Sequence, residues 1–95
     1  MSLRSSRRGK FEIFFDLLRA ITEEQSRNGR ISPTRVQHLA NMSYDKMTRY
    51  LKEMENFGFI SNKSGIKITD KGGNYISDFT KVDDIVAQIE KKYFS

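Results

Sequence analysis

The sequence predicts a mainly α-helical domain with one small β-hairpin, and three observations support this fold class. Apolar residues recur with helical spacing up to residue 57 and again from residue 75 onward. Between these stretches, two short runs of strand-forming residues flank a turn-forming segment at 62–65. The 95 residues, of which 37% are hydrophobic, leave room for one core and a short appendage.

The first element is expected to be a helix with a wide apolar face. Glu12 and Asp16 near its start suit the positive end of the helix dipole. Asn28-Gly29 is expected to end the helix, because glycine readily adopts the left-handed conformation at a helix C-terminus. The apolar positions of this face are Phe11, Phe14, Phe15, Leu17, Leu18 and Ile21.

Two helices joined by a tight turn are expected next. Ser32 is predicted to cap the first of them by accepting a hydrogen bond from a free amide, and Pro33 fits the first helical position. Asn41 tolerates the left-handed conformation and is expected to redirect the chain between the two helices. The apolar stripe of this short first helix consists of Val36, Leu39 and Ala40.

The second of these helices has a cap, a core face and a terminator in its sequence. Ser43 is expected to cap its N-terminus. Gly58 is expected to end it, with Phe59 contacting Met54 as in Schellman endings. The residues expected to face the core are Met47, Leu51 and Met54, with Tyr50 beside them and Phe57 one turn on.

A hairpin and a long helix complete the chain. Strands are predicted at 59–61 and 66–69, and Thr69 or Asp70 is expected to cap the final helix. That helix carries an apolar seam with heptad spacing. The seam consists of Tyr75, Phe79, Val82, Val86, Ile89 and Tyr93.

This order of elements is that of a winged helix-turn-helix domain followed by a further helix. We therefore predict a flexible basic arm at residues 1–9 and a winged helix-turn-helix DNA-binding domain at residues 10–73. A C-terminal dimerisation helix is predicted at residues 74–95.

Composition and charge narrow the classes of function. The chain has no cysteine and no long apolar run, which argues against disulfides, thiolate metal sites and a membrane span. Residues 1–52 carry 11 basic and 5 acidic side chains, whereas residues 53–95 carry 6 and 7. The positive first half favours a nucleic-acid partner. We expect a cytoplasmic, nucleoid-associated protein.

Five sequence segments resemble those of a known family, the small archaeal winged-helix DNA-binding proteins of the ten-kilodalton 10a type. The resemblance implies binding of double-stranded DNA and a homodimer formed through the C-terminal helix as an antiparallel coiled coil. Gly73 departs from the family pattern, in which a charged residue is usual. The segments are Arg8–Ile13, Ala40–Tyr44, Arg49–Leu51, Asn56–Ile60 and Ile68–Gly72.

The residues predicted to contact DNA are mostly cations that do not face the core. A helix-turn-helix places its second helix in the major groove, and the hairpin contacts the flanking backbone. The alternative is an ordinary solvated helix face. The predicted set consists of Ser43, Tyr44, Lys46, Arg49 and Lys52 on the recognition helix, Lys63 and Lys67 on the hairpin, and Arg35, Arg7 and Arg8.

The seam of the final helix has two interpretations. Tyr75 and Phe79 are positioned to close the core against the first helix. The rest of the seam extends roughly 20 Å farther at about 1.5 Å per residue, which favours pairing with a second copy of the chain. The predicted dimer interface consists of Phe79, Val82, Val86, Ile89 and Tyr93.

Catalysis and cofactor binding are not expected. His38 lacks the additional ligands that a metal site requires, and no nucleophile elbow or phosphate loop is present. The leading hypothesis is a homodimeric DNA-binding protein, either a transcription regulator or a chromatin-type architectural protein. The alternative is a winged-helix module for protein–protein interaction within a larger assembly.

Overall fold

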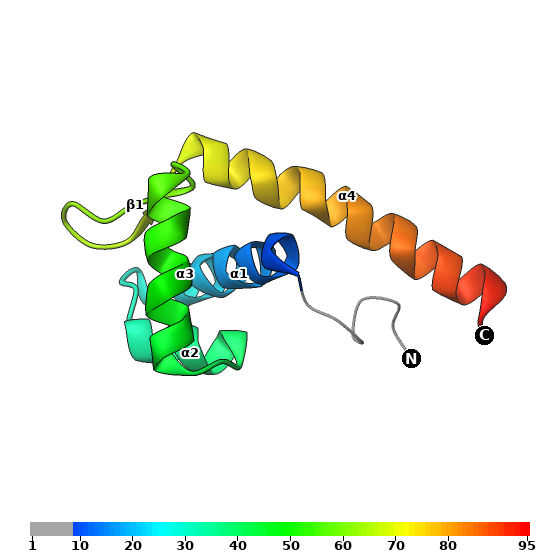
Figure 1. Cartoon of the computed structure of the whole chain (residues 1–95), viewed down its shortest axis with the longest axis horizontal. Coiled ribbons are helices and arrows are strands. Elements are labelled where there is room, and N and C mark those ends of the chain that lie inside the picture. Colours follow the sequence, from blue (N-terminus) through cyan, green and yellow to red (C-terminus); the bar gives the residue numbers. More distant parts are fainter. Residues whose placement is uncertain (1–8) are drawn as a thin grey trace.

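The computed structural model describes residues 9–95, which form four helices and one two-stranded antiparallel sheet. Helices α1 to α3 and the hairpin make a compact body, and α4 extends away from it (Figure 1). This arrangement confirms the predicted fold class. The elements are α1 (Lys10–Asn28), α2 (Pro33–Ala40), α3 (Tyr44–Asn56), β1 (Ile60–Ser61), β2 (Lys67–Ile68) and α4 (Asp70–Tyr93).

Helix α1 is the centre of the core, and the wide apolar face predicted for it is largely buried. Phe11 is the exception and is exposed. The helix ends where the sequence predicts, because Gly29 adopts φ = 65° and donates its N–H to the Gln25 carbonyl at 2.8 Å. The buried residues of α1 are Phe14, Phe15, Leu17, Leu18, Ala20, Ile21 and Glu24.

Two expectations for α2 are wrong in detail. Ser32 occupies the N-cap position, but its side chain makes no capping hydrogen bond. Pro33 has no N–H, so the first turn has one free donor fewer to satisfy. Leu39 is 40% exposed rather than part of the core, since a helix of eight residues presents only the row of Val36 and Ala40 to α1.

The C-terminus of α3 forms the predicted Schellman motif. The Phe59 N–H bonds the Met54 carbonyl at 2.9 Å, and the Gly58 N–H bonds the Glu55 carbonyl at 3.0 Å. Gly58 supplies the required left-handed conformation with φ = 84°. Phe57, expected on the core stripe, is half exposed, although its ring lies 6.1 Å from that of Phe14.

The hairpin is shorter than predicted, with two residues in each strand. Ile60 pairs with Ile68, and Ser61 pairs with Lys67. Thr69 follows β2, and its N–H still bonds the Phe59 carbonyl at 3.1 Å. Its side chain caps α4: the hydroxyl accepts the Gly72 N–H at 3.1 Å and donates to the Gly58 carbonyl. Thr69 therefore joins the end of the sheet to the end of α3 and to the start of α4.

Aromatic side chains attach the first half of α4 to the body. The rings of Phe79 and Phe15 are 4.7 Å apart, and those of Tyr75 and Phe59 are 4.9 Å apart. The Tyr75 hydroxyl donates to the Phe11 carbonyl at 2.5 Å. Burial, and to a smaller extent the nearby Glu12 carboxylate, raise the pKa of Tyr75, which keeps this hydroxyl protonated.

Tyr75 and Phe79 thus close the core against α1, as one interpretation of the seam predicts. The other interpretation assigns Phe79 to the dimer interface. The ring of Phe79 packs against Phe15 of its own chain, where α4 contacts α1.

The two glycines at the start of α4 are expected to respond in opposite ways to substitution by alanine. A Cβ at Gly72 would lie 2.2 Å from the Phe59 carbonyl oxygen, whereas a Cβ at Gly73 meets nothing within 4 Å. We expect Gly72→Ala to lower the free energy of unfolding by about 1–3 kcal/mol. We expect Gly73→Ala to raise it by about 0.5–1 kcal/mol, because the helix loses a flexible residue.

Urea unfolding monitored by circular dichroism measures both effects. Equal changes for the two variants would contradict the close approach of Gly72 to the hairpin.

Candidate nucleic-acid interface

The turn between α2 and α3 is fixed by its own backbone. Asn41 adopts φ = 54° and ψ = 55°, and its N–H bonds the carbonyls of Gln37 and His38. The Ser43 hydroxyl then accepts the Lys46 N–H at 3.2 Å. The predictions for both residues are confirmed. The direction in which α3 leaves the turn is therefore set by local hydrogen bonds as well as by packing.

Helix α3 has one buried face and one exposed face. Met47 and Met54 are fully buried, and Leu51 is partly buried. Because residues four and seven positions apart share a helix face, the opposite side is turned to solvent. The exposed residues of α3 include Tyr44, Asp45, Lys46, Thr48, Arg49, Lys52 and Glu55, so that three cations and one tyrosine accompany two carboxylates.

Tyr50 packs against the body rather than projecting from it, as the sequence predicts. Its ring meets that of Phe14 edge to face at 6.1 Å, and it is partly buried. Glu53, close to the exposed face, is paired with Lys10 of α1 at 2.9 Å. This pair neutralises a carboxylate near the cations and ties α3 to the start of α1.

Besides the hollow that Lys10, Arg49, Lys52 and Asn56 line, two others adjoin the exposed face of α3. One, of about 570 Å³, lies at its N-terminal end and includes Ser43, Lys46 and Tyr50 among its lining residues. The other, of about 390 Å³, lies between α3 and the hairpin. The second hollow is lined by Pro33, Tyr44, Met47, Thr48, Leu51, Lys52, Glu55, Ile60, Asn62 and Ile66. Helix α3 and the hairpin thus border one concave region.

The hairpin carries two exposed cations. Lys67 projects outward from β2 while Ile66 and Ile68 on either side are partly buried, as the alternation predicts. Lys63 is exposed in the loop, where Gly65 adopts φ = 101°. Five of the predicted residues thus lie together at or on α3: Ser43, Tyr44, Lys46, Arg49 and Lys52. Lys63 and Lys67 lie on the hairpin, where Lys67 lines a separate hollow beside the end of α1.

Three predicted residues lie elsewhere. Arg7 and Arg8 fall outside the described residues. Arg35 lies on α2 with its Nε 3.8 Å from the Glu24 carboxylate. Glu24 is almost fully buried in α1, and no sequence prediction singled it out. The available signal was its spacing, three residues after Ile21 and seven after Leu17 on the buried face.

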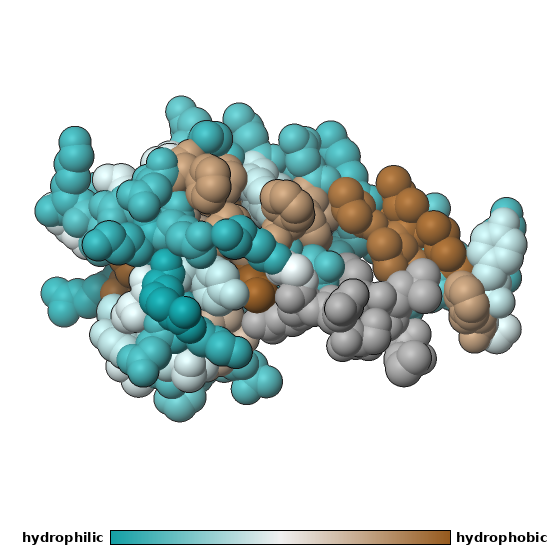
Figure 2. All heavy atoms as spheres, in the orientation of Figure 1, coloured by the Kyte–Doolittle hydropathy of each residue, from teal (hydrophilic) through white to brown (hydrophobic). Residues whose placement is uncertain are grey.

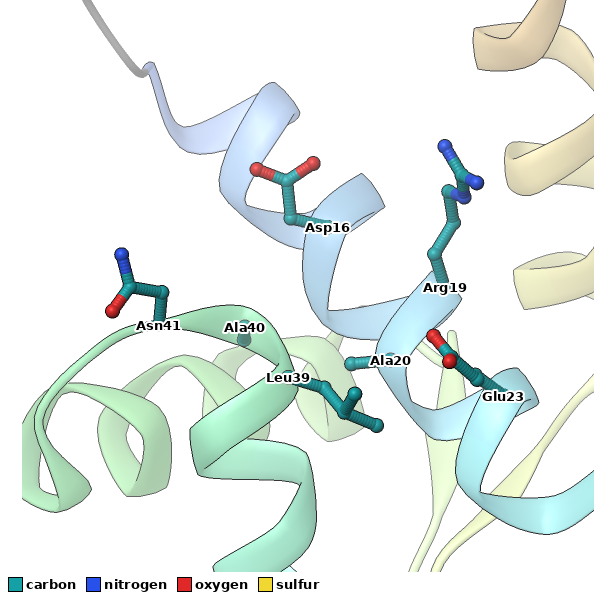
Figure 3. A pocket seen from close by; sticks show the side chains of 7 residues that line it. All are labelled: Asp16, Arg19, Ala20, Glu23, Leu39, Ala40 and Asn41. Atoms are coloured by element: carbon teal, nitrogen blue, oxygen red, sulfur yellow. The ribbon is translucent and has the colours of Figure 1, made fainter. Parts of the chain in front are cut away.

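A further hollow, of about 280 Å³, lies between α1 and α2. Figure 3 shows Asp16, Arg19 and Glu23 projecting from α1 on one side and Leu39 and Asn41 on the other. This hollow is lined by two carboxylates and one guanidinium. Its lining residues include no nucleophile–base pair, so it offers no recognisable catalytic arrangement.

His38 is exposed on α2. Between residues 9 and 95, nowhere do three potential metal-ligating side chains gather. In the same part of the chain, no helix is both long enough and apolar enough to cross a membrane.

The sequence matches the profile of one known protein family. The profile of a family described as winged helix-turn-helix matches residues 7–87, which include every element of the body and most of α4. No curated protein matches the sequence. The match agrees with the observed order of elements.

The two serines before α2 and α3 provide a test of how the turn is held. Ser43→Ala removes a capping hydrogen bond and is expected to lower the free energy of unfolding by about 1 kcal/mol. Ser32→Ala removes no such bond and is expected to change it by no more than a few tenths of a kcal/mol. Chemical denaturation of both variants measures the difference. A loss for Ser32→Ala equal to that for Ser43→Ala would contradict the assigned caps.

Proposed function

Because the chain belongs to the winged helix-turn-helix family, a fold that suggests DNA binding, we propose that it binds double-stranded DNA with α3 in the major groove. One observation carries the proposal: the exposed face of α3 carries three cations, while its opposite face is fixed in the core through Met47 and Met54. A helix held in this way presents the same side chains to every duplex it meets.

The exposed side chains of α3 suit different parts of a duplex. The planar guanidinium of Arg49 matches the two acceptors on the major-groove edge of guanine. Lys46 and Lys52 suit phosphates, since an ammonium group acts as a point charge. Tyr44 at the helix entrance is positioned to contact sugar or a thymine methyl. Ser43 and the first amides of α3 add donors for a phosphate at the helix N-terminus.

Residues outside α3 extend the proposed contact. Lys63 and Lys67 would meet the flanking backbone as the wing. Arg35 is also proposed as a phosphate contact: its side chain remains 62% exposed, and its distance to Glu24 is longer than a hydrogen bond. Arg7 and Arg8, which precede the described residues, are proposed to add further phosphate neutralisation.

The second half of α4 is proposed as the homodimer interface. Val82, Ile85 and Ile89 are 46%, 56% and 38% exposed, and Val86 is partly buried among them. Figure 2 shows the hydrophobic side chains gathered over this part of α4. Tyr93 extends the stripe, whereas Phe79 is engaged by Phe15. Pairing with a second copy would cover the stripe and hold two recognition helices in a fixed relation.

An antiparallel arrangement of the two α4 helices is proposed, as the family resemblance implies, and the charges of α4 support it. Residues 78–84 carry three acidic and one basic side chain, whereas residues 90–92 carry one acidic and two basic side chains. In an antiparallel pair the acidic segment of one chain approaches the basic end of the other, whereas a parallel pair brings like charges together.

Within this proposal the protein is a transcription regulator or a chromatin-type architectural protein, associated with the nucleoid in the cytoplasm. Members of this fold family are typically non-enzymatic DNA-binding domains. The second candidate is a winged-helix module for protein–protein interaction. The half-exposed ring of Phe57 and the apolar stripe of α4 favour it, but the cationic face of α3 has no role in that alternative.

Lys46→Ala combined with Arg49→Ala is expected to weaken binding to duplex DNA by at least tenfold, since each contact to a base or phosphate contributes about 1–3 kcal/mol. Both side chains are exposed, so the melting temperature should stay close to that of the wild type. Fluorescence anisotropy with labelled duplex measures the affinity.

Arg19→Ala with Lys81→Ala is the matched control, because it removes two exposed cations from other surfaces. Equal affinities for the two double variants would contradict the assignment of α3 as the recognition helix.

Ile85→Asp combined with Ile89→Asp is expected to convert a dimer into monomers, because burying paired carboxylates at an apolar interface is strongly unfavourable. Thr80→Asp with Ala87→Asp adds the same charges to the opposite side of α4 and should leave the dimer intact. Sedimentation velocity at tens of micromolar distinguishes the states. Wild-type protein that sediments as a monomer would contradict the dimer proposal.

A further inference from the structure

A basic hollow of about 280 Å³ lies between the C-terminal end of α1 and the loop of the hairpin. Ile66 lines both this hollow and the one beside α3, which places the hairpin between the two. The basic hollow therefore lies across the hairpin from the recognition helix. It is lined by Gln25, Gly29, Arg30, Ile31, Ser64, Gly65, Ile66 and Lys67.

The charges in this hollow all have one sign. Arg30 and Lys67 contribute cations, and none of the lining residues is a carboxylate. Neither cation is engaged in an ion pair within residues 9–95. The neighbouring arginines differ in this respect, since Arg27 pairs with Glu23 at 3.1 Å and Arg35 approaches Glu24. Two unpaired cations that line one concave surface favour an anionic ligand.

The backbone of the hollow also permits a close approach. Gly29 and Gly65 both line it, with φ = 65° and φ = 101°. A Cβ added at either position would meet nothing within 4 Å, so the space above both glycines is open. A bulky ligand group can therefore approach the main chain here, and the Ser64 hydroxyl adds a hydrogen-bonding group beside it.

We propose that this hollow, in which Lys67 of the wing lies beside Arg30, binds one backbone phosphate of the duplex outside the segment that α3 contacts. The inference rests on the proposed DNA binding and extends its footprint across the hairpin. The guanidinium of Arg30 binds the phosphate through its planar set of donors, and Lys67 adds a second positive charge. Arg30 thereby becomes a positioning contact, which fixes the protein on the duplex without reading its sequence.

The test compares the salt dependence of duplex binding for the full-length protein and its variants. Arg30→Gln is expected to lower the affinity severalfold, and Arg30→Lys to restore most of it. Arg30→Gln combined with Lys67→Gln should reduce the slope of log K against log salt by about 0.9, the value for one phosphate contact. Arg19→Gln removes one exposed cation from the middle of α1 and is the matched control.

The outcomes separate this inference from the proposed function. If the wild-type protein binds duplex DNA and Arg30→Gln behaves like Arg19→Gln, the phosphate site is wrong and DNA binding by α3 stands. A slope that falls by about 1.8 for the double variant would indicate two independent contacts and would overturn the single site. Failure of the wild-type protein to bind duplex DNA would overturn both proposals.

Discussion

The burial of one face of α1 is the constraint on which the rest of the structure depends. Helices α2, α3 and α4 and strand β2 all contact α1, and the buried residues of the other elements converge on its apolar face. Because α3 must direct Met47 and Met54 toward this core, its cationic side is turned outward. The surface proposed to bind DNA is therefore a consequence of how the core is filled.

The same constraint determines how much of α4 is covered. Phe79 and Tyr75 are held by rings of the body, and the Tyr75 hydroxyl bonds the first turn of α1. Beyond them α4 runs past the end of the core (Figure 1), and Val82, Ile85 and Ile89 are exposed. The two proposed interaction surfaces thus lie at different places on the protein, with DNA at α3 and the hairpin and a second chain at α4.

Features that depend on a few neighbouring residues could be predicted from the sequence. The left-handed Asn41, the Ser43 cap and the Schellman motif at Gly58 all belong to this class. Their hydrogen bonds close over three to six residues, so residue types at fixed spacing are enough to identify them. The exposed cations of α3 followed in the same way from the spacing of its apolar residues.

Features that depend on tertiary contacts could not be predicted. The heptad spacing of α4 omits Ile85, whose exposure depends on which side of the helix the body covers. Glu24 is polar in sequence but buried, because α2 packs over it and brings Arg35 nearby. Arg30 stands alone in a loop, and its nearness to Lys67 appears only when the hairpin is placed beside the end of α1.

The most direct test of the central claim is a titration of the wild-type protein with duplex and single-stranded DNA of the same sequence at several salt concentrations. We predict tighter binding to the duplex, and a slope of log K against log salt of about −3 or steeper, because at least three cations would neutralise phosphates. Equal affinity for both forms, or a slope near zero, would contradict the account of α3 as a major-groove helix.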